Sequence, residues 1–181
     1  MIMIICDDAG WGKIKVSGEN VSWGDRLSYL DDVPFALLDA FIESCKKHKP
    51  AAVRFDAEGY EYILVVEWTH MYVIYQDYSF LEQMGMKPAE SELADVKVDR
   101  DTLARELIAD IRGDVEAWAG FSCDCREEDV PARCEALLKM CDELESLLDS
   151  AGHVLALQSM HDELESMFPS ADCVPSDGGE K

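Results

Sequence analysis

The stretch that decides the fold runs from Ala51 to Gln76 and reads AAVRFDAEGYEYILVVEWTHMYVIYQ. It is dense in β-branched and aromatic residues, and DAEG interrupts it once with Gly59 at a position suited to a left-handed hairpin turn. The five residues from Tyr62 to Val66 lack polar alternation, which predicts a central strand covered on both faces. The pattern predicts strands over residues 51–57, 60–68 and 71–76.

The preceding segment predicts a hairpin and a helix. Residues 1–6 (MIMIIC) and 13–18 (KIKVSG) flank the turn formers DDAGWG, and a polar connection follows them. Asp32 as N-cap, Pro34 in the first turn and an apolar stripe from Phe35 to Cys45 predict a helix over 34–47. We expect this helix to cover one face of the sheet and later helices to cover the other.

The following segment predicts a loop and then helices. Residues 77–98 are irregular and are expected to form a loop. A stripe of apolar residues at spacings of three and four predicts a helix over 100–119, capped by Asp99 or Asp101. Pro131 begins another helix, whose stripe consists of Leu137, Cys141 or Met140, Leu144 and Leu148.

One phrase occurs twice, as MCDELESLLDS at 140–150 and MHDELESMFPS at 160–170. On one straight helix a shift of twenty residues leaves a rotation of about 200°, so the copies would face opposite ways. A break at Gly152 would instead allow an αα-hairpin with both DELES segments in solvent. Chance repetition of a Leu/Glu-rich phrase is the alternative.

These elements define an α+β protein. We expect an antiparallel or mixed sheet of about five strands with one helix, followed by an acidic helical second half that ends in an αα-hairpin. The chain is expected to form a single domain over 1–168, sheet-rich in 1–76 and helical in 99–168. The tail over 169–181 has little apolar content and is expected to be flexible.

The charge is strongly negative and uneven. The chain carries 16 Lys and Arg against 38 Asp and Glu, a net charge of −22. Residues 1–75 contribute seven minus twelve, or −5, and residues 76–181 contribute nine minus twenty-six, or −17. Such a field repels phosphates, so we expect neither direct nucleic-acid binding nor membrane binding, whereas a basic protein partner would be attracted. Acidity that serves only solubility is the alternative.

The cysteines and the N-terminus indicate the compartment. Seven cysteines in scattered contexts form no disulfide framework, so free thiols in a reducing compartment are expected. The start MIMIICDD has no basic region and too short an apolar run for a signal peptide. A cytoplasmic location is therefore predicted.

Candidate chemistry is sparse. Asp7 and Asp8 follow an apolar strand and could hold a divalent metal, which makes a small metal-dependent enzyme the alternative function, although DDAG is also good turn chemistry. Cys123 and Cys125 form C-x-C without the second close pair that a structural zinc site needs. Nucleotide-binding and standard hydrolase motifs do not occur. No cofactor is expected, and an enzyme is the less favoured interpretation.

A small, acidic, motif-poor α+β chain resembles the bacterial toxin-immunity proteins, which neutralise a toxin by masking its active surface. The resemblance implies an inhibitor whose basic partner is a toxin or nuclease, and a DNA-mimic inhibitor is a variant of this idea. No functional residue is carried over from it. The doubled phrase itself predicts the binding carboxylates, which are expected to matter little for stability: Asp142, Glu143, Glu145, Asp162, Glu163 and Glu165.

The cysteine pattern makes a first testable prediction. Titration of the unfolded, unreduced protein with a thiol reagent should count all seven cysteines, because an odd and scattered set has no pairing framework. A count of three or fewer would overturn the free-thiol interpretation. Stoichiometric zinc in protein purified without added metal would instead favour a site at Cys123 and Cys125.

Overall fold

The computed structural model describes seven stretches of the chain: residues 2–7, 11–17, 22–28, 32–57, 60–77, 89–122 and 125–167. Side chains are described for 32–57, 60–77, 91–122 and 125–150. The chain forms two compact units, Met1–Leu148 and Asp149–Lys181. The expected α+β class is confirmed, and the tail over 169–181 lies outside the described residues.

The first sheet contains three antiparallel strands in the order β1-β2-β3: β1 (Ile2–Asp7), β2 (Trp11–Ser17) and β3 (Ser22–Ser28). The predicted opening hairpin is confirmed, with Ile4 opposite Ile14. Strand β3 replaces the expected polar connection. Its sequence, SWGDRLS, is rich in residues that disfavour strands, so the ladder with β2 determines its conformation rather than local propensity.

The second sheet has the order β4-β5-β6-β7, and all its pairings are antiparallel. Strands β4 (Ala51–Asp56), β5 (Tyr60–Val66) and β6 (His70–Asp77) confirm the three predicted strands. Strand β7 (Ala89–Lys97) lies where a loop was expected. In the part of β7 whose side chains are described, only Ala94 and Val96 are buried, so this polar edge strand gives a weak sequence signal. The prediction of about five strands is wrong, because the described residues already form seven strands in two sheets.

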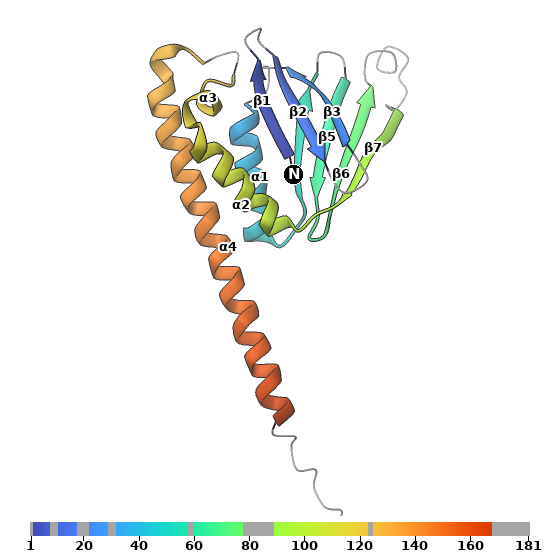
Figure 1. Cartoon of the computed structure of the whole chain (residues 1–181), viewed down its shortest axis with the longest axis vertical. Coiled ribbons are helices and arrows are strands. Elements are labelled where there is room, and N and C mark those ends of the chain that lie inside the picture. The colour runs from blue at the N-terminus through green and yellow to red at the C-terminus, as the bar shows by residue number, and fades with distance from the viewer. Residues whose placement is uncertain are drawn as a thin grey trace, which may run out of the picture. The chain divides into compact units, whose positions relative to one another are not determined.

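One face of the second sheet carries the core. Cross-strand partners Val53, Leu64, Val73 and Ala94 are all buried. On the other face Ile63 and Ile74 are half-buried, and Arg54 is exposed. Buried apolar residues of each described α-helix join the same cluster as this inner face. Helices α1 (Val33–Lys47), α2 (Arg100–Gly113) and the first part of α4 (Val130–Met167) lie to one side of β5–β7 (Figure 1). The expectation that helices cover opposite faces of the sheet is therefore wrong.

Helix α1 (Val33–Lys47) confirms the helix predicted over 34–47. Pro34 lies in its first turn, and His48 ends it in the left-handed conformation with φ 50°. Asp32 occupies the N-cap position, but its side chain makes no capping hydrogen bond. Its carboxylate binds Arg133 of a later helix instead.

The helix predicted over 100–119 is two helices, α2 (Arg100–Gly113) and α3 (Val115–Ala119). Asp99 caps α2 as predicted, accepting a hydrogen bond from the Thr102 amide at 2.7 Å. Asp114 separates the helices because its side chain accepts a hydrogen bond from the Ala117 amide and so caps α3. A short 3-10 helix, η2 (Glu127–Asp129), precedes the last helix.

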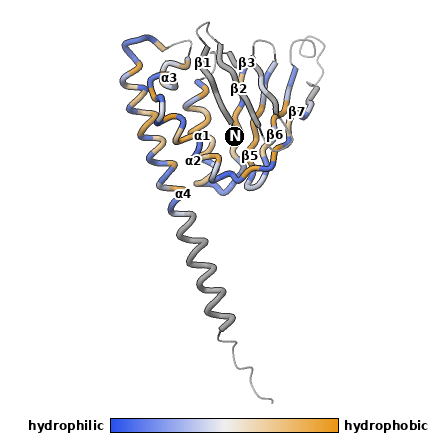
Figure 2. Tube along the Cα trace, viewed as in Figure 1, coloured by the Kyte–Doolittle hydropathy of each residue, from blue (hydrophilic) through white to orange (hydrophobic). Residues whose placement is uncertain are grey.

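Helix α4 (Val130–Met167) confirms the predicted stripe: Leu137, Cys141, Leu144 and Leu148 are at most 2% exposed. Cys141 rather than Met140 completes this stripe, and apolar and polar positions alternate along the described turns of α4 (Figure 2). The expected αα-hairpin is wrong, because α4 continues through Gly152 to Met167. One glycine inside a helix costs only about 1 kcal/mol relative to alanine, which does not force a break.

No helix among the described stretches is both long enough and apolar enough to cross a membrane.

The core role of α4 can be tested with two leucines on the same helix. Leu144→Ala should lower the free energy of unfolding by about 2–5 kcal/mol, because this side chain is fully buried and its removal leaves a cavity. Leu138→Ala is the matched control, since Leu138 is 37% exposed and should cost less than about 1 kcal/mol. Chemical denaturation measures both. Equal effects of the two substitutions would show that the apolar stripe of α4 is not buried in the shared core as described.

Candidate functional site

An arginine on α4 holds together the start of α1 and the end of α3. The Arg133 guanidinium donates two hydrogen bonds to the Asp32 carboxylate, at 2.8 and 2.9 Å. Its Nε donates to the Ala119 carbonyl at 2.6 Å, and its planar group lies 4.8 Å from the centre of the Phe35 ring. The Arg133 side chain is 19% exposed. Hydrogen bonding to Asp32 raises the pKa of Arg133 above its ordinary value.

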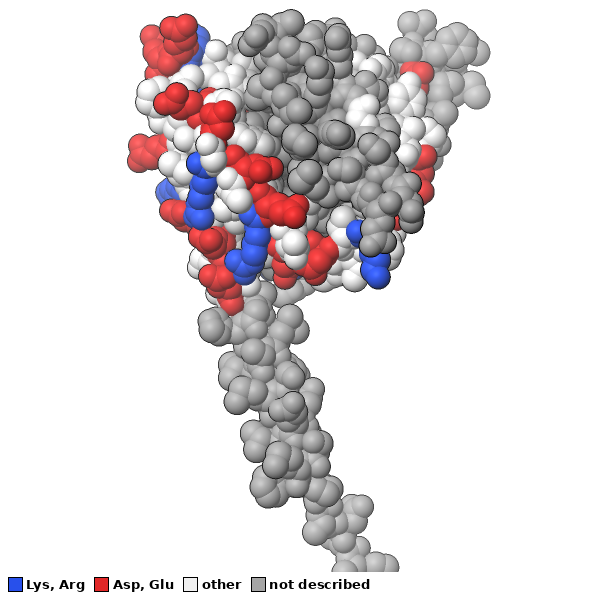
Figure 3. Space-filling model, in the orientation of Figure 1, with Lys and Arg blue, Asp and Glu red and all other residues white. Residues whose placement is uncertain are grey.

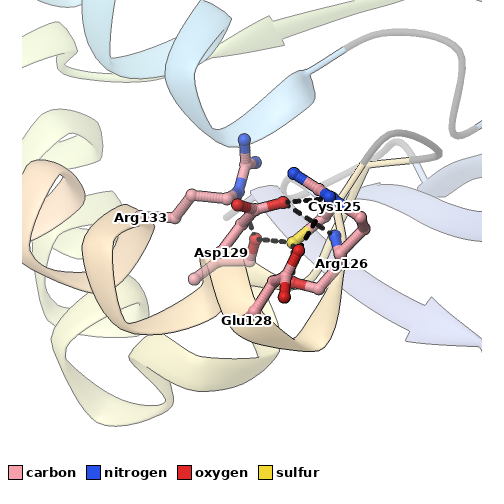
Figure 4. A network of polar contacts seen from close by, with 6 residues as sticks. Cys125, Arg126, Glu128, Asp129 and Arg133 are labelled. Atoms are coloured by element: carbon pink, nitrogen blue, oxygen red, sulfur yellow. Dashed lines mark hydrogen bonds and ion pairs between the residues drawn. The ribbon is translucent and has the colours of Figure 1, made fainter.

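A cleft of about 500 Å³ opens beside this arginine. Arg126 lies in the same network and binds Asp129 at 3.1 Å and Glu128 at 2.7 Å (Figure 4). Arg133, which lines the cleft, and the nearby Arg126 are thus already neutralised by carboxylates of the same chain, which disfavours binding of an anionic ligand. Its lining residues are Asp32, Phe35, Ser122, Cys125, Asp129, Ala132, Arg133 and Ala136.

Cys125 is the only predicted metal candidate whose side chain is described. Its thiol donates to the Ala119 carbonyl at 3.5 Å and to the Arg126 carbonyl at 3.6 Å. Within the described residues, no three His, Cys, Asp or Glu side chains come together as a metal site. The side chains of Asp7, Asp8 and Cys123 lie outside the described set, so the metal-enzyme alternative stays a prediction.

The described cysteines are free thiols: Cys45, Cys125, Cys134 and Cys141. This agrees with the free-thiol prediction for four of the seven cysteines, and the other three side chains lie outside the described residues. Burial raises the pKa of the Cys141 thiol to about 11, and burial also raises the pKa of Cys45. Both thiols are therefore protonated near neutral pH and are poor nucleophiles.

Half of the predicted binding carboxylates form ion pairs within the chain. On α4, Asp142 and Glu145 bind Arg112 of α2 at 2.7 and 2.9 Å. Glu143 binds Lys46 of α1 at 2.6 Å. Hydrogen bonds to Glu145 and Asp142 raise the pKa of Arg112 further above its ordinary value.

These three carboxylates therefore join α4 to α1 and α2, a role that the sequence analysis missed. The i, i+3 spacing of Asp142 and Glu145 places both on one face of the helix, but only the tertiary fold brings Arg112 to them. The side chains of the other three predicted carboxylates, Asp162, Glu163 and Glu165, lie outside the described set.

The remaining acidity is exposed on the helices. Residues 99–150 contain fifteen Asp and Glu against six Lys and Arg, a net charge of −9. Four of these cations, Arg100, Arg112, Arg126 and Arg133, each bind a carboxylate of the same chain. Acidic side chains outnumber basic ones over the helical side of the molecule (Figure 3). We define the acidic helical surface by five exposed carboxylates that form no ion pair with the described residues: Glu106, Asp110, Glu116, Glu127 and Glu135.

Comparisons with protein-family models, with curated proteins and with solved structures find no match to this chain.

The contribution of the Arg133–Asp32 ion pair to stability can be tested by a double-mutant cycle. Asp32→Asn, Arg133→Met and the double variant should give a coupling energy of about 0.5–3 kcal/mol, because the pair is bidentate and partly buried. Arg126→Met is the control, since the Arg126 side chain is 72% exposed and its loss should change stability by no more than about 0.5 kcal/mol. A coupling energy near zero would show that the pair does not hold α4 to α1.

Proposed function

We propose that this chain is a protein-binding protein that uses its acidic helical surface to mask a basic partner. The observation that supports this proposal is the distribution of charge on α2 to α4. The four arginines named above are already bound to carboxylates of the chain, so the exposed carboxylates dominate the surface potential. Such a surface accelerates encounter with a cationic protein and sets its orientation.

The same charge disfavours the other large classes of partner. Phosphates of nucleic acids and of anionic lipids would be repelled by a chain with a net charge of −22. Within this proposal, the partner carries a basic active surface, as a nuclease does, and masking that surface inhibits it. The protein would then act as toxin-immunity proteins do, in keeping with the resemblance noted from the sequence.

We also propose a reducing, cytoplasmic location for this inhibitor. The four described cysteines are free, which supports a compartment that keeps thiols reduced.

Within this proposal, three of the carboxylates predicted from the sequence serve both stability and binding. Asp142, Glu143 and Glu145 remain available to a partner, because their side chains are 74%, 44% and 44% exposed. Their ion pairs to α1 and α2 mean, however, that neutralising them should affect stability as well as binding. The acidic helical surface offers a cleaner test, because its five carboxylates form no ion pair with the described residues.

The test compares two neutralised variants of the full chain. The surface variant carries Glu106→Gln, Asp110→Asn, Glu116→Gln, Glu127→Gln and Glu135→Gln. The ion-pair variant carries Asp142→Asn, Glu143→Gln and Glu145→Gln. At low salt, the surface variant should associate with the partner captured from the native host at least about tenfold more slowly than wild type, and added salt should remove the difference.

Melting temperature provides the control. The surface variant should melt close to wild type, whereas the ion-pair variant should melt lower, because it loses ion pairs that each stabilise the fold by up to about 1 kcal/mol. If the surface variant associates with the captured partner as fast as wild type at low salt, the acidic helical surface is only a solvated face and the proposed function is wrong.

A further inference from the structure

An exposed tryptophan lies at the turn between β5 and β6. Trp68 is 50% exposed and is the most exposed large apolar residue among the described side chains. The other tryptophan with a described side chain, Trp118, is 8% exposed and belongs to the core. Exposing an indole forgoes a large amount of apolar burial, and exposed tryptophans are enriched at the energetic centres of protein interfaces.

The backbone around Trp68 is held rigidly. The Glu67 amide donates to the His70 carbonyl at 2.8 Å, which closes the turn. The start of α2 fixes the turn from outside, because the Arg100 amide donates to the Trp68 carbonyl at 3.1 Å and the Val98 amide donates to the Thr69 carbonyl at 3.0 Å. Trp68 is thus preorganised, and a partner that contacts it need not order the loop.

The Trp68 indole already makes a cation–π contact with an arginine of the same chain. The Arg100 guanidinium lies 5.9 Å from the centre of the Trp68 ring. Arg100 is itself 8% exposed and is fixed by Asp101 at 2.7 Å and by the Ser44 hydroxyl at 3.2 Å. Asp101 neutralises its charge, so Arg100 supports the ring while adding little repulsion toward a second cation.

Carboxylates outnumber cations in the turn of Trp68 and in the segment whose backbone bonds to it. The turn and the adjoining segment over 95–101 contribute Glu67, Asp95, Asp99 and Asp101 against two cations, Lys97 and Arg100. Asp99 follows Val98 and precedes Arg100, and the amides of both these residues bond to the turn. The hydrogen bonds from Thr102 hold the pKa of Asp99 below its ordinary value, so this carboxylate is charged at neutral pH.

We propose that Trp68 is the anchor of the interface and receives an arginine side chain of the basic partner, with Glu67 and Asp99 beside it to neutralise the guanidinium. An arginine fits this site better than a lysine, because its planar group stacks on an indole and can bind a carboxylate at the same time. This inference rests on the proposed function and adds the residue type that the partner presents.

The test measures binding of fluorescein-labelled nona-arginine and nona-lysine peptides to the full chain at low salt, by fluorescence anisotropy. Trp68→Leu keeps apolar bulk but removes the aromatic ring, and Trp68→Phe keeps a smaller ring. Trp68→Leu should bind nona-arginine about tenfold more weakly than wild type and should bind nona-lysine with a smaller loss. The affinity of Trp68→Phe for nona-arginine should lie between those of wild type and Trp68→Leu. Leu138→Ala is the control, because it removes an exposed apolar side chain from α4 and should bind like wild type.

The outcomes separate this inference from the proposed function. If wild type binds both peptides and Trp68→Leu and Trp68→Phe bind them equally well, Trp68 is not the anchor and the proposed function stands. Equal losses for the two peptides in Trp68→Leu would overturn the assignment of arginine. If wild type binds neither peptide at low salt, the chain does not attract cationic protein segments, and both the proposed function and this inference are wrong.

Discussion

One buried apolar cluster joins the inner face of β4–β7 to all four described α-helices, and this constraint determines the rest of the structure. The inner face of β4–β7 presents Phe55, Leu64 and Met71, each at most 1% exposed, and α1, α2, α3 and α4 all contribute to the same buried cluster. Because the helices share this cluster, each must place its apolar stripe inward and its charged residues outward or against a neighbouring helix. The acidic sequence of the second half therefore becomes an acidic surface by geometric necessity.

The ion pairs follow from the same arrangement. Helices that contribute to one buried cluster bring Arg133 of α4 to Asp32 of α1, and Asp142 of α4 to Arg112 of α2. Each of these contacts uses a cation of the helical layer and leaves the surplus carboxylates exposed. The same packing of the helices thus produces both the acidic surface and the ion pairs that hold α4 in place. The exposed Trp68 lies at the turn to which the Arg100 amide of α2 bonds, and the Arg100 guanidinium, paired with its neighbour Asp101, lies 5.9 Å from the centre of the Trp68 ring.

The sequence predicted those elements whose apolar pattern is strong. Strands β4, β5 and β6, helix α1 and the buried stripe of α4 follow from hydrophobic periodicity and caps. Strands β3 and β7 were missed because their polar sequences form strands only by pairing with a neighbour. The hairpin at Gly152 was wrong because a glycine alone does not end a helix. The pairing of Asp142 and Glu145 with Arg112 could not be predicted, since these partners are 30 and 33 residues apart in the sequence and meet only in the folded chain.

Native-state hydrogen exchange tests most directly the claim that all the helices share one cooperative core. In urea titrations of the exchange rates, amides of α4 between Leu137 and Leu148 should open with the same free energy and the same denaturant dependence as those of β5, because both belong to one buried cluster. If the α4 amides instead open in a separate step of markedly lower free energy while β5 stays protected, α4 is an appendage. The acidic helical surface would then not be a fixed feature of the folded domain.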